Sequence, residues 1–140
     1  MENWIIPCNP NFYDVIGAFT KLKRIDWKQS MKNINVGDIV YIYSSSPDSC
    51  IKYKLMVEAH DVTYNTDFDK EKEFYVDAKD FEIAKEHNRF IKLRLLSESH
   101  THKMSLPHLL ENGLSMAPRG GMNLSNASAA KLLKYIEENF

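Results

Sequence analysis

The sequence is poor in cysteine and has no long hydrophobic run. Its two cysteines, Cys8 and Cys50, lack a CxxC partner, which argues against a disulfide framework and for a reducing compartment where both are small buried hydrophobes. No apolar stretch approaches the roughly 20 residues of a membrane-spanning helix. The start of the chain also lacks the charged-then-apolar pattern of a signal peptide. We therefore expect a cytoplasmic protein that has no membrane partner.

The chain also lacks a strong charge of either sign. Its net charge is −1 and its pI is near 6.5, which argues against a protein that coats nucleic acid non-specifically. The charges are nevertheless unevenly distributed. Residues 21–32 carry five basic side chains against one acidic, and residues 67–86 carry eight acidic against four basic. The basic segment would suit a local anionic partner; the alternative is that both segments are solvated faces.

Recognised catalytic and metal-binding motifs are missing as well. The sequence contains no Gly-rich phosphate loop, HExxH motif or nucleophile elbow. His100 and His102 are two residues apart, but no third ligand follows at a recognised spacing, so a solvated loop is the preferred interpretation. We expect neither a metal nor another cofactor, and the sequence favours a binding module over an enzyme.

The length and composition suit one domain over residues 1–140, with 44% hydrophobic residues to build a core. Apolar periodicity and turn residues predict a series of strands and helices. The predicted strands cover residues 4–8, 39–43, 51–57, 73–76 and 89–96, with a short extended piece at 23–28; the predicted helices cover residues 11–19, 105–113 and 125–138. The state of residues 77–86 stays open.

These elements predict an α+β domain built around a small curled β-barrel flanked by helices. The run 39–43 is continuously apolar, which is typical of a central strand. It is joined to the alternating run 51–57 by a short Ser- and Pro-rich turn, so the two form a predicted hairpin. Such a short connection does not suit a doubly wound parallel sheet.

Two segments are candidates for ligand contacts. Trp27 stands among Lys28, Gln29 and Ser30, where a large aromatic has no evident core to fill and could serve as a stacking platform beside directional polar groups. The alternative is that Trp27 belongs to the core, as we expect for Trp4 in its apolar strand.

The second candidate segment is the loop 118–121, Pro-Arg-Gly-Gly. Its glycines, Gly120 and Gly121, let the backbone approach a ligand closely, and the Arg119 guanidinium is a forked donor suited to phosphate or a base edge. The alternative is a tight turn with an arginine that faces solvent.

The order of these features resembles the PUA-like superfamily, and within it the EVE domains with their YTH relatives. The resemblance rests on a first strand that ends in a polar turn at Asn9, a lone Trp27 before the Gly37-Asp38 turn, a strand that ends in Tyr43-Ser44, and a Pro-Arg-Gly loop before the last helix. It spans nearly the whole chain, and the Gly-Asp-strand element is its firmest part.

The resemblance implies a curled barrel with a pocket that accepts one extruded base. Trp27 would be the aromatic wall, Cys8 and Asn9 would meet the base edge, Tyr43 and Ser44 would be the strand-end residues, and Arg119 would meet the backbone phosphate. Trp4, Tyr64 and Phe68 are the candidates for a second aromatic. Pro7-Cys8 stands where a Lys-Ser or Lys-Thr pair would be typical.

The resulting hypothesis is a non-catalytic module that binds DNA or RNA carrying a modified base. Its base pocket comprises Trp27, Cys8, Asn9, Ser30, Tyr43 and Ser44, and its phosphate contacts are Lys28, Arg119 and Gly120. One alternative is a small-molecule or nucleotide sensor, or a small enzyme, that uses the same pocket. Another is a protein-interaction module with an unknown protein partner.

Overall fold

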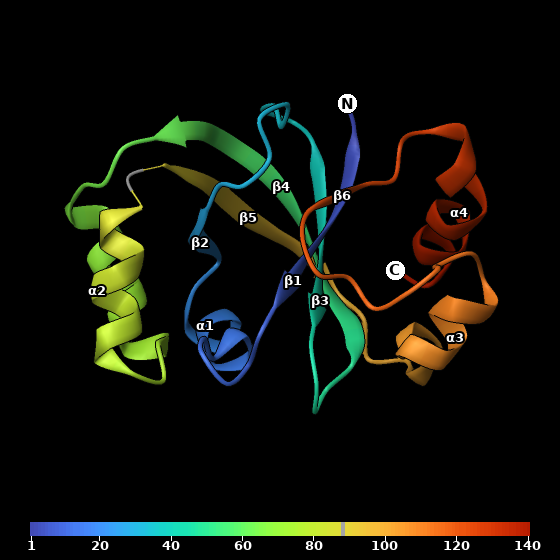
Figure 1. Ribbon diagram of the computed structural model, residues 1–140, viewed down its shortest axis with the longest axis horizontal. Helices are drawn as coiled ribbons and strands as arrows, with labels where there is room; N and C mark the ends of the chain where they lie inside the picture. Colours follow the sequence, from blue (N-terminus) through green and yellow to red (C-terminus); the bar gives the residue numbers. More distant parts are fainter. Residues whose placement is uncertain (88) are drawn as a thin grey trace.

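The computed structural model describes residues 1–87 and 89–140 and has the predicted mixture of strands and helices (Figure 1). The strands are β1 (Asn3–Cys8), β2 (Arg24–Lys28), β3 (Ile39–Ser44), β4 (Cys50–Val62), β5 (Phe90–Glu98) and β6 (Met122–Asn123). The α-helices are α1 (Val15–Lys21), α2 (Ala78–Glu86), α3 (Leu106–Glu111) and α4 (Ala130–Glu138), and the 3-10 helices are η1 (Thr66–Phe74), η2 (His102–Met104) and η3 (Ala127–Ala129).

The six strands form one mixed sheet in the order β2-β5-β4-β3-β1-β6. β1 and β3 run parallel, and the other neighbours are antiparallel, including the predicted β3–β4 hairpin. The α+β class is therefore confirmed. Closure into a barrel is not seen, because β2 and β6 remain separate edges in the described part of the chain and the sheet is an open, twisted one (Figure 1).

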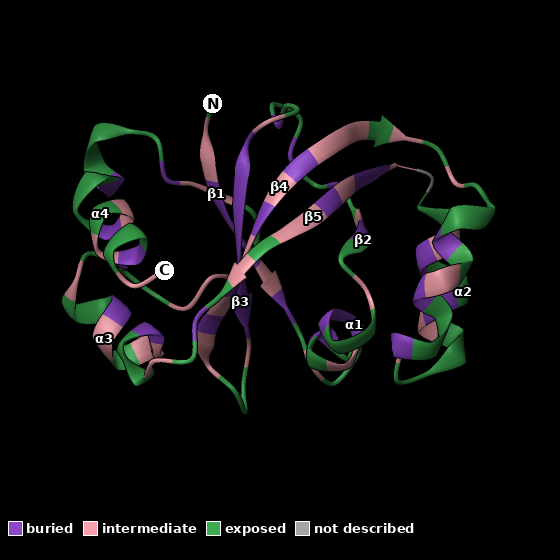
Figure 2. Ribbon diagram, turned by 180° about the vertical axis from the view of Figure 1, so that it is seen from behind, coloured by how far each residue is buried: buried purple, intermediate pink, exposed green. Residues whose placement is uncertain are grey.

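The sheet separates two hydrophobic cores, since successive strand residues point to opposite faces. Trp4 and Ile6 of β1 enter the core that also contains α1 and β2, whereas Ile5 enters the core covered by α3 and α4. The buried segments of the central strands are visible between the two groups of helices (Figure 2). Trp4 is a core residue, as predicted, and Tyr41 and Tyr43 share one face of β3.

A buried carboxylate fastens β1 beside β3. Gly37 has φ +92°, a conformation that L side chains rarely adopt, and it places Asp38 at the start of β3. Asp38 then accepts hydrogen bonds from the Trp4 indole Nε1 (3.0 Å), the Asn35 backbone N–H (2.9 Å) and the Glu2 backbone N–H (2.9 Å). The Gly-Asp motif therefore has a structural role: the three hydrogen bonds to Asp38, called the Asp38 clasp below, set the position of the first strand.

One predicted element is wrong, and another begins later than expected. The strand expected at 73–76 is the end of η1 followed by a single bridge between Tyr13 and Tyr75. The helix expected over residues 11–19 is α1, which begins only at Val15, where the Asp14 side chain caps it by accepting a hydrogen bond from the Gly17 N–H (3.0 Å).

The open segment 77–86 contains α2. Within the described residues, no helix combines the length and the apolar character that crossing a lipid bilayer requires.

Candidate functional site

A pocket of about 420 Å³ opens where the end of β1, the following turn, β2 and the loop 118–121 meet. In Figure 1 the long segment between α3 and α4 passes in front of the strands, and its β6 pairs with β1, which brings a late part of the chain beside the first strand. Besides Ile6, Pro7 and the two glycines Gly120 and Gly121, the lining comprises aromatic, polar and basic residues: Asn9, Phe12, Tyr13, Trp27, Lys28, Ser30, Tyr75, His87 and Arg119.

Aromatic rings form the walls of this pocket. Trp27 is half-buried on β2, and its ring meets the Tyr13 ring edge-to-face, with centroids 5.1 Å apart and an interplanar angle of 82°. The Tyr75 ring also meets the Tyr13 ring edge-to-face, with centroids 5.2 Å apart and an interplanar angle of 75°. Such edge-to-face pairs stabilise each other beyond simple burial, so the walls keep their orientation without a ligand.

A buried carboxylate holds Tyr13 from behind. The Tyr13 hydroxyl donates to Glu71 Oε1 (2.5 Å), and the Asp26 backbone N–H donates to Glu71 Oε2 (2.9 Å). Glu71 is 0% exposed, and burial raises its pKa to about 7 even though these two hydrogen bonds favour the charged form. Burial, followed by the Glu71 charge, also raises the pKa of Tyr13, so its hydroxyl remains a donor.

Two lysines form ion pairs with the buried Asp26 carboxylate beneath the pocket. The buried Asp26 carboxylate lies 3.0 Å from Lys70 Nζ and 3.1 Å from Lys92 Nζ. Lys70 Nζ also lies 4.0 Å from Glu71 Oε2. The acidic segment that the sequence presented as a solvated face therefore contributes one fully buried residue, Glu71, to the support of the site.

Cations, by contrast, stand at the exposed mouth. Lys28 and Arg119 are exposed, and neither makes an ion pair with any residue of the ranges 1–87 and 89–140. The described lining contains no Asp or Glu. The His87 imidazole also lines the pocket, and its Nε2 lies 3.3 Å from the Gln29 carbonyl oxygen. The mouth can therefore attract an anion while the walls accept a flat, apolar group.

The segment after β2 is anchored from both sides. Gln29 is buried; its Oε1 accepts from the Asp61 N–H (2.6 Å), and its Nε2 donates to the Met31 carbonyl (2.9 Å). A Cβ added to Gly121 would lie 2.3 Å from Met31 Sδ, so the absence of a side chain there lets the loop approach this segment. Lys28 and Ser30 are thereby presented at fixed places on the rim.

The structure brings together most of the site residues expected from the sequence. Trp27, Asn9, Ser30, Lys28, Arg119 and Gly120 all line this one pocket.

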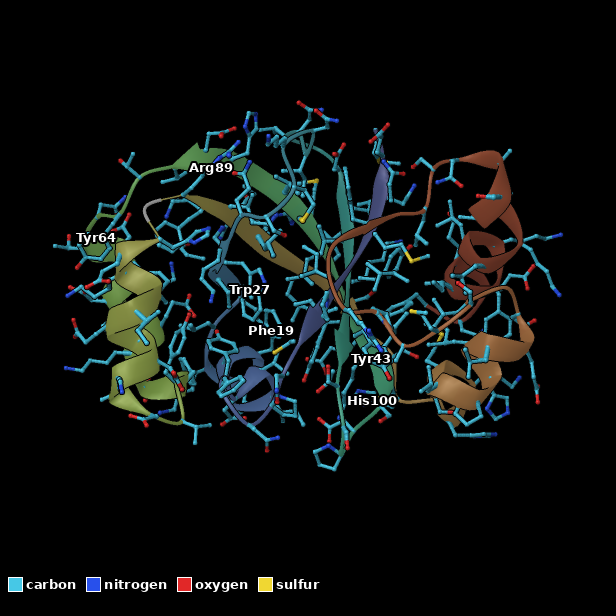
Figure 3. All side chains as sticks on the ribbon, viewed as in Figure 1. Phe19, Trp27, Tyr43, Tyr64, Arg89 and His100 are labelled. Carbon is cyan, nitrogen blue, oxygen red and sulfur yellow. The ribbon has the colours of Figure 1, made fainter. Side chains whose placement is uncertain are left out.

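Three expected residues lie elsewhere. Cys8 is buried in the core, which raises its thiol pKa to about 12. Tyr43 belongs to the core beneath α3 and α4 and lies apart from Trp27 in Figure 3. The buried Ser44 hydroxyl donates to Asp48 (2.7 Å). The alternation of side chains along β3 accounts for Tyr43, since that position faces away from the pocket.

The second aromatic was expected at Trp4, Tyr64 or Phe68, and none of these lines the pocket. Trp4 and Phe68 are core residues, and Tyr64 lies near α2 at one end of the molecule (Figure 3). Tyr13 and Tyr75 line the pocket instead, and neither was expected there from the sequence. The position of Tyr13, just after the polar turn at Asn9, was the one available signal.

The histidine-rich loop forms a separate hollow of about 330 Å³. His100 Nε2 lies 3.4 Å from Glu98, and the His102 ring packs edge-on against His108. No group of three or more His, Cys, Asp or Glu side chains suited to a metal ion is found in the part of the chain that the structure describes.

No protein-family model matches the chain, and no curated protein matches it by sequence. Solved structures do match. The ASCH protein from Zymomonas mobilis has a TM-score of 0.63 at 17% identity and covers 94% of both chains. PSPTO5229 from Pseudomonas syringae has a TM-score of 0.65 at 13% identity over 99% of both chains. Human THYN1, an EVE-domain protein, has a TM-score of 0.58 at 11% identity, covering 100% of this chain and 99% of its own.

The chain has a PUA-like fold. The likeness extends over nearly the whole length of the chains compared, so the resemblance to PUA-like proteins is confirmed for the fold, whereas the curled barrel it implied is an open sheet. At these identities the likeness concerns the arrangement of the backbone, and the chemistry of the pocket has to be argued from this chain's own residues.

Proposed function

We propose that the aromatic pocket binds one base of a nucleic-acid strand and that it prefers a modified base turned out of the stack. Trp27 stacks on the base, and Asn9 and Ser30 contact its polar edge. Lys28, Arg119 and the Gly120 backbone hold the neighbouring phosphate. The protein acts on this ligand by binding it, without a catalytic step.

The observation that carries the proposal is the combination of aromatic walls with unpaired cations at one mouth. The described lining offers Trp27, Tyr13 and Tyr75 inside, Lys28 and Arg119 outside, and no carboxylate. A nucleotide has the same division, with a flat aromatic base and an anionic phosphate. The volume of about 420 Å³ also falls in the range of pockets that enclose small ligands.

The comparisons support the same ligand class. The THYN1 structure of this fold is a complex with 5-methylcytosine-containing DNA. The fold can therefore present a surface to nucleic acid, and the pocket described above is a candidate for the corresponding contact in this chain.

The energetics favour selection by the pocket rather than by bulk charge. Stacking of one base on an aromatic side chain contributes roughly 1–3 kcal/mol, and extrusion of a paired base costs a few kcal/mol. The net charge of −1 adds little long-range attraction. Binding would therefore be strongest for single-stranded or weakly paired sites whose modified base fills the pocket.

The test is a titration of fluorescein-labelled oligonucleotides, followed by anisotropy, at one moderate salt concentration. The panel carries unmodified cytosine, 5-methylcytosine, 5-hydroxymethylcytosine or N6-methyladenine, in single and double strands. We expect a preference for one modified base and a loss of about tenfold or more in Trp27→Ala, since stacking is removed. Trp27→Phe, which keeps a ring against Tyr13, should lose less.

Trp4→Phe is the matched control, because Trp4 lies in the core away from the pocket lining. It should keep the affinity of the wild type. Equal affinity across the panel would refute base reading. Equal affinity for a free nucleoside and for the oligonucleotide would instead favour the small-molecule sensor.

A further inference from the structure

Phe12 is an exposed aromatic residue at the mouth of the pocket. It lines the pocket, yet 54% of it remains exposed to solvent. It follows the turn that begins at Asn9 and directly precedes Tyr13, whose ring forms the inner wall. One part of its surface therefore faces the pocket while the rest is open.

The backbone around Phe12 is held on both sides. The Phe12 N–H donates to the Asn9 carbonyl (3.0 Å), and the Phe12 carbonyl accepts from the Val76 N–H (3.0 Å). Tyr13 forms a bridge with Tyr75. A residue fixed in this way loses little further backbone freedom when a ligand covers its ring.

The exposed apolar surface continues beyond Phe12. Val76 is 64% exposed and is joined to Phe12 through the hydrogen bond described above. Single exposed apolar residues are common on protein surfaces. The present pair differs because it adjoins a lined pocket and because its backbone is fixed there.

A strand that inserts one base into the pocket has to leave across this mouth. Its phosphates would be attracted to Lys28 and Arg119 at the same mouth, which favours a polyanionic occupant over an apolar peptide. The base next to the inserted one then needs a new stacking partner, because it has lost its neighbour. The exposed Phe12 ring is available for that contact.

We propose that Phe12 is a second stacking platform, which receives the base adjacent to the one in the pocket on the same strand. The inference rests on the proposed function and deepens it, because it makes the ligand at least a dinucleotide. It predicts that a free modified nucleoside binds more weakly than the same nucleoside with a neighbouring base.

The experiment combines a variant with a change in the ligand. Single-stranded oligonucleotides carry the preferred modified base, and the nucleotide on its 5′ or 3′ side is either intact or abasic. For the wild type, removal of the stacked neighbour on one side should weaken binding about tenfold. Phe12→Ala should lose the same factor with the intact strand and show no further loss with the abasic one.

The controls separate stacking from general effects. Ile83→Ala removes an apolar residue that is also 54% exposed but lies on α2 and does not line the pocket, so it should bind like the wild type. Phe12→Trp keeps an aromatic ring at this position, so, unlike Phe12→Ala, it should still bind the abasic strand more weakly than the intact one. Thermal melts check that Phe12→Ala remains folded.

Three results would overturn the platform. An equal loss in Phe12→Ala for intact and abasic strands would make Phe12 only a wall of the first pocket. A wild type indifferent to abasic neighbours, with Trp27 still essential, would refute the platform and leave the proposed function standing. Failure of every oligonucleotide to bind would refute the proposed function, and the platform with it.

Discussion

Glu71 is a fully buried carboxylate behind the pocket, and its proton couples the stability of the protein to pH. Two hydrogen bonds support the charged form, one from the Tyr13 hydroxyl and one from the Asp26 N–H. Burial outweighs both and raises the pKa to about 7, from an ordinary value of 4.5. Other charges that face it are those of Lys70 on η1 and Asp26 on β2, and Lys92 on β5 acts through Asp26.

The direction of the pH effect follows from that difference. Between pH 4.5 and 7 the folded protein retains a proton that the unfolded chain has released, so the contribution of Glu71 to stability is largest below pH 4.5 and is lost as the pH rises through 7. The expected change is roughly 3 kcal/mol, since one pKa unit corresponds to about 1.4 kcal/mol.

Denaturant unfolding of the wild type and of Glu71→Gln at several pH values measures this change. Glutamine cannot ionise, so the difference between the two free energies of unfolding isolates Glu71 from the other titrating groups. We expect the wild type to lose stability relative to Glu71→Gln across pH 4.5–7 and to run parallel to it above that range. Parallel profiles throughout would show that Glu71 does not titrate there.

At the scale of elements, the Asp38 clasp determines how β1 enters the sheet. Asp38→Ala would leave the Trp4 indole N–H and two backbone N–H groups without their acceptor, and Trp4 is buried. Loss of this acceptor from one buried and two partly buried donors costs about 3 kcal/mol. We expect that decrease in the free energy of unfolding.

Asp38→Asn is the matched variant, because its amide oxygen can still accept from part of this set, and it should lose less. Ligand affinity at a temperature where Asp38→Ala is folded should stay close to that of the wild type, because Asp38 does not line the pocket. A selective loss of affinity without a loss of stability would contradict this division of roles.

The strands β3 and β4 were predictable because their signals are local. The continuous β-branched and aromatic run of β3 and the alternation in β4 are properties of short segments. In η1, by contrast, the buried residues Phe68, Glu71 and Phe74 follow a spacing of three. That spacing is the period of a 3-10 helix, but one member is a glutamate in a highly charged stretch, so the segment resembled a solvated loop.

The site was predictable only in part, for a reason that concerns tertiary contacts. The family-like order of motifs indicated the group around Trp27 and Arg119. Tyr13 and Tyr75 come together through a single bridge between distant segments, and no local pattern announces such a contact. Conversely, the motif Tyr43-Ser44 was present in the sequence, but the pleat of β3 directs Tyr43 into the other core.

At the scale of the whole molecule, a net charge of −1 limits electrostatic binding to the few cations at the pocket mouth. Each phosphate contact contributes a slope of about −0.7 to the logarithm of the association constant against the logarithm of the salt concentration for single strands. Two contacts, from Lys28 and Arg119, therefore predict a slope of about −1.4. A protein that coats nucleic acid with a basic surface would show a much steeper dependence.

Arg119→Gln should reduce that slope by about 0.7 and weaken binding to modified and unmodified strands by a similar factor, because a phosphate contact carries no base preference. Lys131→Gln on α4 is the matched control, since it makes the same change in net charge at an exposed site away from the pocket lining; it should leave the slope unchanged. Anisotropy titrations at four or five salt concentrations measure both variants. An equal reduction in the two would mean that the overall field governs binding, whereas a loss of base preference in Arg119→Gln would place the guanidinium against the base edge instead of the phosphate.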